Sequence, residues 1–327
     1  MKVSYSQICS NLLKTLPQKQ KEVLSRRFGL AASGSAEKET LESIGQSFGI
    51  TRERVRQIEE DGLLKLKPQL KTHQKIFWFF KEYLKNSGGL KKEETLLSDL
   101  GGKNWQNQIY FLLNLGEDFL RYAETDDFYS FWALNEDSTL KAKKIISSLS
   151  EKLKKIKKPF SVKEIDSLFS LNKNFLTSCL EISKKIQKNQ EGRWGLLDWP
   201  EINPRGVKDK ALLVFKKENK PLHFKEVASL IPKALPQTVH NELIKDPRFV
   251  LVGRGVYALR EWGYEDGFVK DVIFKTLKEA GKPLSKDKIL EKVLKQRLVK
   301  ENTVLLNLAD KKYFTRTTNN FYIIREA

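Results

Sequence analysis

A short block recurs three times in the sequence at a constant interval. It reads KPFSVKEI at 158–165, KPLHFKEV at 220–227 and KPLSKDKI at 282–289, so its proline recurs every 62 residues. Such regular internal similarity is the signature of a chain built from repeated structural units. A chain of 327 residues is also too long for one compact helical core. The repeat therefore predicts a row of small domains.

Each block has the same surroundings. A helical segment precedes it, a further helical pattern follows it, and an aromatic, strand-like stretch closes the unit. Helices followed by a hairpin within about 60 residues describe a winged helix. A weaker copy occupies 73–136. We therefore expect a mainly α fold with small β-hairpin wings, in which about four winged-helix units follow a helix-turn-helix domain. The expected domains are 1–72 (helix-turn-helix), 73–140 (degenerate acidic winged helix), 141–206 (winged helix with a basic leading helix), 207–266 and 267–327 (winged helices).

The first 72 residues carry the helix-turn-helix pattern. LPQKQKEVLSRRFGL (16–30) has a helical apolar stripe and ends at Gly29, a plausible C-cap. After a loop of small residues, TLESIGQSFGI (40–50) predicts a short helix that ends at a glycine turn, and Thr51 is suited to cap the next helix. A helix, a glycine turn and a second helix with a polar outer face form the arrangement that places a helix in the major groove.

The second of these helices, TRERVRQIEEDGLLKLK (51–67), divides into two faces. At 100° per residue its apolar positions fall within about 80° of arc, which predicts a buried stripe. Long polar side chains with directed donors and acceptors, the type that contacts base edges, fall on the opposite arc. A solvated charged face is the alternative interpretation of such a helix. The apolar positions are Val55, Ile58, Gly62 and Leu66, and the polar ones are Arg52, Glu53, Arg56 and Gln57.

RRFGL, TLESIGQSFGITRERVRQIE and GLLKLK together resemble region 4 of the sigma-70 family of bacterial RNA polymerase sigma factors over about residues 12 to 70. The resemblance implies binding to the minus-35 promoter element and to a flap of the polymerase β subunit. The sequence shows no region 2, the part of that family that opens the minus-10 element, so a self-sufficient sigma factor is not expected. The candidate DNA-binding residues are Thr51, Arg52, Glu53, Arg54, Arg56, Gln57 and Lys65.

The last two units, roughly 207–262 and 267–326, resemble the HARE-HTH winged-helix family, which includes the δ subunit of some bacterial RNA polymerases. The similarity is one of pattern more than of signature. It points to the same enzyme, RNA polymerase, as the head of the chain does.

The predicted units differ in net charge. The chain has a net charge of +19, which favours a polyanionic partner. Residues 73–140 are acidic, which suits a protein contact better than DNA, and their aromatic run IFWFF (76–80) is expected to be core. Further DNA contacts are possible on the lysine-rich segment 141–158, for which a solvated helix is an equal alternative. They are also possible on a helix near 236–246, for which a solvated face is the plainer explanation. These secondary candidates are Lys154, Lys155, Gln237, His240, Asn241 and Lys245; the same caution applies to Lys300, Asn302 and Asn307.

Other classes of protein are disfavoured. The two cysteines are far apart and no pair of the three histidines has the spacing of metal ligands, so neither metal nor cofactor is expected. Catalytic motifs and acidic clusters with recognisable spacing are missing, so an enzyme and a small-molecule substrate are not expected. No apolar run approaches the roughly 20 residues that span a bilayer. We therefore expect a cytoplasmic, nucleoid-associated protein without a membrane partner.

Two functions remain. The first is a transcription initiation factor that recognises promoter DNA and contacts RNA polymerase. The alternative is a δ-like accessory or scaffold protein of the polymerase with little sequence-specific DNA binding.

Overall fold

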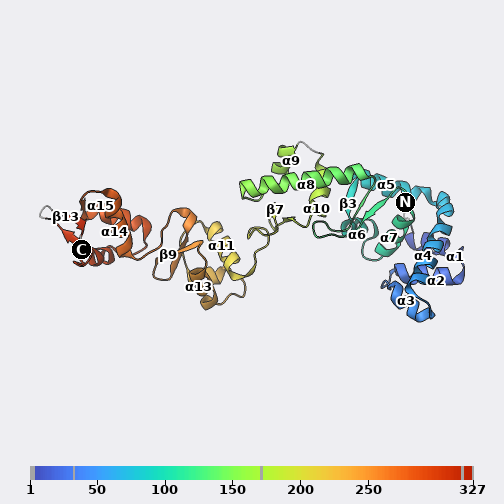
Figure 1. The fold of residues 1–327 in the computed structure, drawn as a ribbon, viewed down its shortest axis with the longest axis horizontal. Coiled ribbons are helices and arrows are strands. Elements are labelled where there is room, and N and C mark those ends of the chain that lie inside the picture. Colours follow the sequence, from blue (N-terminus) through green and yellow to red (C-terminus); the bar gives the residue numbers. More distant parts are fainter. Residues whose placement is uncertain (1–3, 32–33, 170–171, 318–319, 326–327) are drawn as a thin grey trace. The chain divides into compact units, whose positions relative to one another are not determined.

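The computed structural model describes residues 4–31, 34–169, 172–317 and 320–325. It divides into two compact units, 1–197 and 198–327 (Figure 1). The expected fold class is confirmed: helices predominate, and the strands form small antiparallel sheets.

The head of the first unit consists of four helices. A 3-10 helix, η1, leads out of the last of them, and a short hairpin, β1–β2, occupies part of the segment expected to be a loop. The elements are α1 (Tyr5–Lys14), α2 (Gln18–Phe28), β1 (Leu30–Ala31), β2 (Gly34–Ser35), α3 (Leu41–Phe48), α4 (Arg52–Leu66) and η1 (Lys67–His73).

Local chemistry sets the boundaries of these helices. Gly29 and Gly49 adopt the left-handed conformation that ends α2 and α3. Thr40 and Thr51 cap α3 and α4, because each side chain accepts a hydrogen bond from a backbone N–H three residues later. The predicted turn and the predicted cap at Thr51 are therefore confirmed.

Two winged helices follow the head and complete the compact unit 1–197. In the first of them the strands form one sheet in the order β3-β5-β4. In the second, β6 pairs only with β7, and a bridge between Phe160 and Trp194 takes the place of the third strand. The elements are α5 (Gln74–Asn86), β3 (Leu90–Lys92), α6 (Glu93–Gly101), α7 (Gln106–Leu115), β4 (Leu120–Tyr122), β5 (Phe131–Ala133), α8 (Glu136–Ile156), α9 (Val162–Phe169), α10 (Lys173–Ile182), β6 (Ile186–Lys188) and β7 (Trp194–Leu196).

The second unit also contains two winged helices, and each has a three-stranded sheet with the first strand beside the last. The elements of the first are α11 (Gly206–Glu218), β8 (Leu222–His223), α12 (Phe224–Leu230), α13 (Pro236–Lys245), β9 (Phe249–Gly253), β10 (Val256–Leu259) and η2 (Arg260–Trp262). Those of the second are α14 (Val269–Ala280), β11 (Leu284–Ser285), α15 (Lys286–Gln296), α16 (Glu301–Leu308), β12 (Phe314–Arg316) and β13 (Phe321–Ile324).

One hydrophobic cluster joins the head to the first winged helix. It includes Leu12, Leu24 and Leu66 from the head together with Phe80 and Phe111 from the winged helix. The rings of Phe28 and Phe111 meet edge to face with centroids 5.1 Å apart. The described residues between Tyr5 and Leu134 therefore bury apolar surface together, although the sequence predicts a domain boundary at 72. The four expected boundaries remain predictions.

The aromatic run at 76–80 is only partly core. Ile76 and Phe80 are buried as expected, but Trp78 and Phe79 are 65% and 44% exposed. The expectation fails for these two residues because successive positions on a helix are rotated by about 100°, so a continuous apolar run cannot all face one core.

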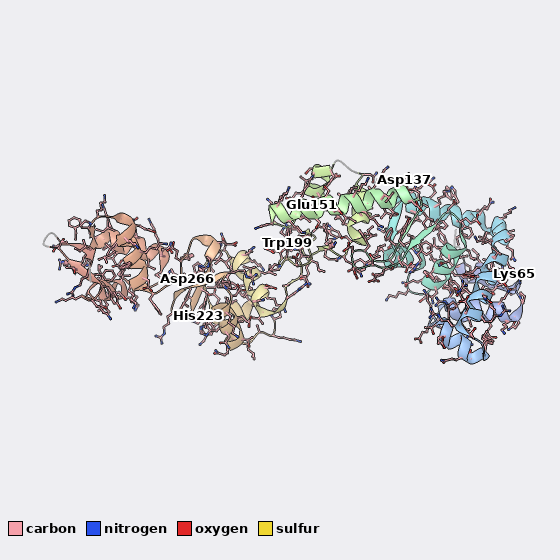
Figure 2. All side chains as sticks on the ribbon, in the orientation of Figure 1. Lys65, Asp137, Glu151, Trp199, His223 and Asp266 are labelled. Atoms are coloured by element: carbon pink, nitrogen blue, oxygen red, sulfur yellow. The ribbon has the colours of Figure 1, made fainter. Side chains whose placement is uncertain are left out.

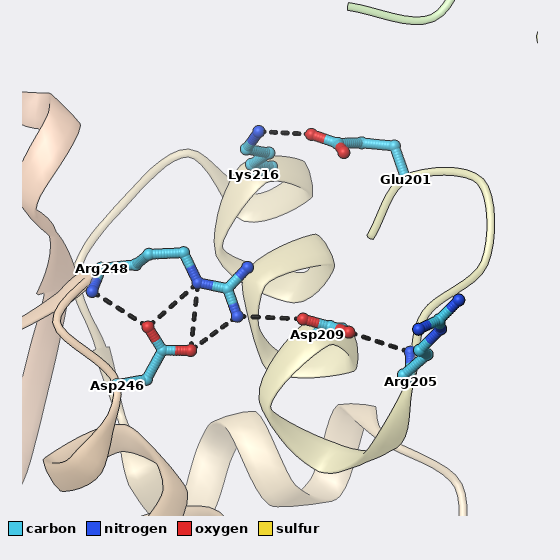
Figure 3. A network of polar contacts seen from close by, with 6 residues as sticks. All are labelled: Glu201, Arg205, Asp209, Lys216, Asp246 and Arg248. Atoms are coloured by element: carbon cyan, nitrogen blue, oxygen red, sulfur yellow. Dashed lines mark hydrogen bonds and ion pairs between the residues drawn. The ribbon is translucent and has the colours of Figure 1, made fainter. Parts of the chain in front are cut away.

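A partly buried polar network links two elements of the first winged helix of the second unit (Figure 3). The Arg248 guanidinium donates to Asp209 on α11 at 2.9 Å and to Asp246, after α13, at 2.6 Å. Asp209 also accepts a hydrogen bond from the backbone N–H of Arg205. The network fixes the first turn of α11 to the corner that leads into β9.

Candidate nucleic-acid interface

α3 and α4 meet across a small apolar core. Val23 of α2, Ile44 of α3, and Val55 and Ile58 of α4 form one buried cluster. Gly45 permits the close turn between α3 and α4, because a Cβ there would lie 2.8 Å from the backbone oxygen of Ile50. The backbone N–H of Ile50 donates in turn to the Gly45 carbonyl at 3.0 Å. The angle between the two helices is thus set by backbone contact.

The polar face of α4 is exposed as predicted. The four residues expected in the apolar stripe of α4 are all buried. Lys65, labelled in Figure 2, lies in the last turn of α4. Its ammonium donates to the Gln20 side chain of α2 at 3.3 Å. Exposure is confirmed for every primary candidate, namely Thr51, Arg52, Glu53, Arg54, Arg56, Gln57 and Lys65. Their DNA-binding role remains a prediction.

Two of the three arginines of α4, Arg54 and Arg56, contact neighbours on the same helix. Arg56 donates to Glu53 through Nε and Nη2 and forms an ion pair with Glu60. The hydrogen bond from Arg56 lowers the pKa of the Glu53 carboxyl. Arg54 donates to the Gln57 side chain at 2.9 Å. These contacts are exposed and cost little to break, so a phosphate or base edge could take them over.

Charge is unevenly distributed along α4. The first turns carry three arginines, Arg52, Arg54 and Arg56, against Glu53 alone. The next turns carry Glu59, Glu60 and Asp61. Since the helix N-terminus adds partial positive charge, anions are attracted to the beginning of α4 and repelled from its middle. A duplex would therefore meet α4 at its N-terminal end.

A set of ion pairs that sequence analysis did not identify supports the helix-turn-helix. Arg26 of α2 donates to both carboxylate oxygens of Glu39, at 2.8 and 2.7 Å, and to the Ser47 hydroxyl of α3 at 2.7 Å. Arg27 pairs with the half-buried Glu59 of α4 at 3.5 Å. Burial raises the pKa of Glu59, and Arg27 opposes that shift. The two arginines of RRFGL thus connect α2 to its neighbours: Arg26 contacts α3, and Arg27 contacts α4.

The third helix of the first winged unit faces the head rather than solvent. The Asn107 side chain of α7 donates to the carbonyls of Gly29 at 3.1 Å and Ala36 at 2.7 Å. The Gln108 side chain, which is buried, donates to Ala31. In a DNA-binding winged helix of this class the corresponding helix would enter the groove. Here α7 is occupied by an internal protein contact.

The third helix of the second winged unit is occupied in the same way. The Ser178 hydroxyl of α10 donates to the Ser87 carbonyl at 2.8 Å, and Glu181 pairs with Lys91 of β3 at 2.8 Å. Gly88 allows this approach, since a Cβ there would lie 2.4 Å from the Cα of Phe175. The third helix of each winged helix in residues 73–197 therefore contacts the preceding part of the chain: α7 contacts the head, and α10 contacts the first winged helix.

The secondary candidates differ in their positions. Lys154 and Lys155 are exposed in the last turn of α8, and Gln237, Asn241 and Lys245 are exposed on α13. His240 does not lie fully outward as expected. Its ring is half-buried and stacks on Phe224 with centroids 4.4 Å apart, because position 240 is one residue from the buried stripe of α13.

Two further observations concern the cysteines and the possibility of a membrane span. Cys9 and Cys179 are buried and free, and burial raises the pKa of each thiol to about 12. Among the described residues, no helix has the length and apolar character needed to cross a bilayer.

Comparison with known proteins places the head in a family. Residues 12–68 match the family model of sigma-70 region 4, so the head contains a domain of that kind. The RNA polymerase sigma factor SigA of Microcystis aeruginosa and that of Synechocystis sp. (strain ATCC 27184 / PCC 6803 / Kazusa) are each 41% identical over 75 residues. The aligned part is 23% of this chain and only 16% of each relative. The predicted resemblance of the head is confirmed.

Proposed function

We propose that this chain is a transcription initiation factor that binds minus-35-type promoter DNA through α4 and contacts bacterial RNA polymerase. The observation that carries the proposal is the exposed polar face at the start of α4, within a sigma-70 region 4 domain, with all seven primary candidate side chains exposed. Arg52, Arg56 and Gln57 contact bases or phosphates, and Thr51 holds the helix end that faces the DNA. The SigA relatives are named as RNA polymerase sigma factors, which supports polymerase as the partner.

The test begins with genome-wide crosslinking of the tagged full chain, compared with maps of polymerase and of the main sigma factor. We expect enrichment at a set of promoters, and a duplex from such a site then serves as the probe. If Arg56 makes a bidentate base contact, Arg56→Ala weakens binding to that duplex roughly 5- to 100-fold and spares a scrambled duplex. Arg316→Ala, an exposed arginine on β12, is the matched control. Crosslinking confined to coding regions would contradict the proposal.

A second function, that of a δ-like scaffold on the polymerase, is favoured by one specific observation. α7 and α10 are both occupied by contacts within the chain, so the winged helices of residues 73–197 do not offer their third helices to DNA. The resemblance of 207–266 and 267–327 to HARE-HTH units fits the same role. A scaffold would bind core polymerase in the absence of promoter DNA and leave promoter choice unchanged, which a pull-down with and without the duplex tests.

A further inference from the structure

A groove of about 730 Å³ opens where the head meets the first winged helix. Leu70 of η1, Phe77 of α5 and Phe119 supply apolar lining, and Trp78 stands on one wall with 65% of its surface exposed. The loop after α7 lies directly on the rings, because a Cβ at Gly116 would come within 2.6 Å of Phe119. An exposed tryptophan beside an apolar groove is the usual anchor of a protein interface.

Two ion pairs hold the walls of the groove together. Lys67 pairs with Glu117 at 3.4 Å, and Lys81 pairs with Asp118 at 3.0 Å. Lys71 also lines the groove, and among the described residues it has no carboxylate partner. The groove thus offers an apolar anchor site with one available cation at its edge.

These charges favour a protein segment over nucleic acid. A phosphate backbone entering the groove would meet Glu117 and Asp118, whose carboxylates already use two of the three lysines. An apolar side chain can instead cover the Trp78 ring while a single carboxylate of the same segment reaches Lys71. The expected occupant is therefore a peptide segment with an apolar residue next to an acidic one.

The position of the groove indicates which protein supplies this segment. Leu12, Leu24 and Leu66 of the head are covered by α5 and α7 of the same chain, so this apolar surface is not available to an additional partner. Lys67 and Pro68 of the groove lie at the end of the sigma-70 region 4 match, and Thr51, at the DNA-facing end, precedes α4. The 15 residues of α4 span about 22 Å, which separates the groove from the DNA face.

We propose that this groove binds an acidic, apolar-anchored segment of RNA polymerase while α4 holds DNA. The inference rests on the proposed function for the identity of the partner, and on the groove itself for the place and chemistry of the contact. The region 4 match ends at residue 68, so most of the contact lies on residues that follow that domain.

The experiment measures the affinity of the full chain for purified core RNA polymerase from the same organism. We expect Trp78→Ala to weaken binding about tenfold or more and Lys71→Glu to weaken it severalfold. Phe79→Ala is the matched control, because Phe79 is an exposed aromatic residue of the same helix and does not line the groove. It should change affinity less than twofold. Circular dichroism verifies that each variant is folded.

The same variants are titrated with the promoter duplex and with a single-stranded oligonucleotide of equal length. Unchanged duplex binding by Trp78→Ala, alongside lost polymerase binding, supports the groove as a protein site. Polymerase binding by Trp78→Ala that equals the unsubstituted chain overturns the inference and leaves the proposed function intact. Loss of oligonucleotide binding without loss of polymerase binding overturns it in favour of nucleic acid. If the unsubstituted chain binds duplex but not core polymerase, the polymerase part of the proposed function fails as well.

Discussion

The Asn107 side chain donates a hydrogen bond to the backbone carbonyl of Ala36, 71 residues earlier in the chain, at 2.7 Å. The same amide also donates to Gly29, and Gly29 has the left-handed backbone that a side chain would strain. One residue of α7 thereby secures both ends of the hairpin that precedes the helix-turn-helix. The position of α3 and α4 consequently depends on the winged helix behind them.

Asn107→Ala should lower the free energy of unfolding of the first unit by about 1–3 kcal/mol, because the Ala36 carbonyl loses its side-chain donor and the Gly29 carbonyl keeps only the backbone N–H of Ala36. Denaturant unfolding measures the change, and amide exchange should increase between residues 34 and 48. Asn114→Ala is the control, since Asn114 bonds only one turn back, to the Tyr110 carbonyl of its own helix. Equal effects of the two substitutions would show that the link to the head carries no stability.

Gly45→Ala should distort the turn between α3 and α4. The added Cβ would lie 2.8 Å from the backbone oxygen of Ile50, a rigid neighbour that must shift. We expect a loss of about 1–3 kcal/mol in the free energy of unfolding and weaker DNA binding, because α4 is reoriented.

Gly49 provides the comparison for that substitution. Its Cβ would meet nothing within 4 Å, but its φ of +65° disfavours most side chains. Asparagine tolerates this conformation, so Gly49→Asn should cost less than Gly45→Ala in the same unfolding measurement. A larger cost for Gly49→Asn would mean that space in the turn is less limiting than backbone conformation.

Glu60→Gln should strengthen binding of the chain to duplex DNA of any sequence severalfold at low salt. The change removes a negative charge from the exposed face of α4 and releases one contact of Arg56. Electrophoretic mobility shift with promoter and scrambled duplexes measures it. The Glu53 contact remains in this variant, so Arg56 stays ordered. Tighter binding to the promoter alone would argue instead that Glu60 opposes a specific base contact.

Much of this organisation could be predicted from the sequence because local signals carry it. The caps at Thr40 and Thr51, the glycine turn and the buried stripe of α4 follow from short-range chemistry that a single helix displays. The repeated proline block likewise marked the winged helices. The predictions were weaker wherever a side chain's partner lies far along the chain.

Asn107 and Trp78 illustrate that limit. An asparagine in an apolar helix gives no sign that it will bond carbonyls more than 70 residues away. Trp78, inside IFWFF, looks like core until the orientation of α5 on the head is known. The partners of Asn107 depend on how two neighbouring domains pack, which helix periodicity in either domain alone does not contain. For Trp78, periodicity shows only that the whole run at 76–80 cannot be buried.

The folding stability of the second unit should decrease at acidic pH. Burial by itself would raise the pKa of Asp246, but hydrogen bonds from Arg248 outweigh it and lower that pKa below its ordinary value. The carboxylate therefore stabilises the fold fully at pH values above about 4, the unfolded-state pKa, and this contribution is lost as pH falls through the folded pKa. Asp246→Asn should remove that part of the pH dependence in unfolding experiments below about pH 4.

Arg248→Met tests the same network at neutral pH by removing its cation instead of a carboxylate. It leaves Asp209 and Asp246, both largely buried, without their shared cation, and we expect a loss of about 1–3 kcal/mol after allowance for the partly exposed guanidinium. Lys216→Met, which breaks the more exposed pair with Glu201, should cost less than 1 kcal/mol. An equal loss in both variants would indicate that solvent screens the Arg248 network as fully as it screens a surface pair.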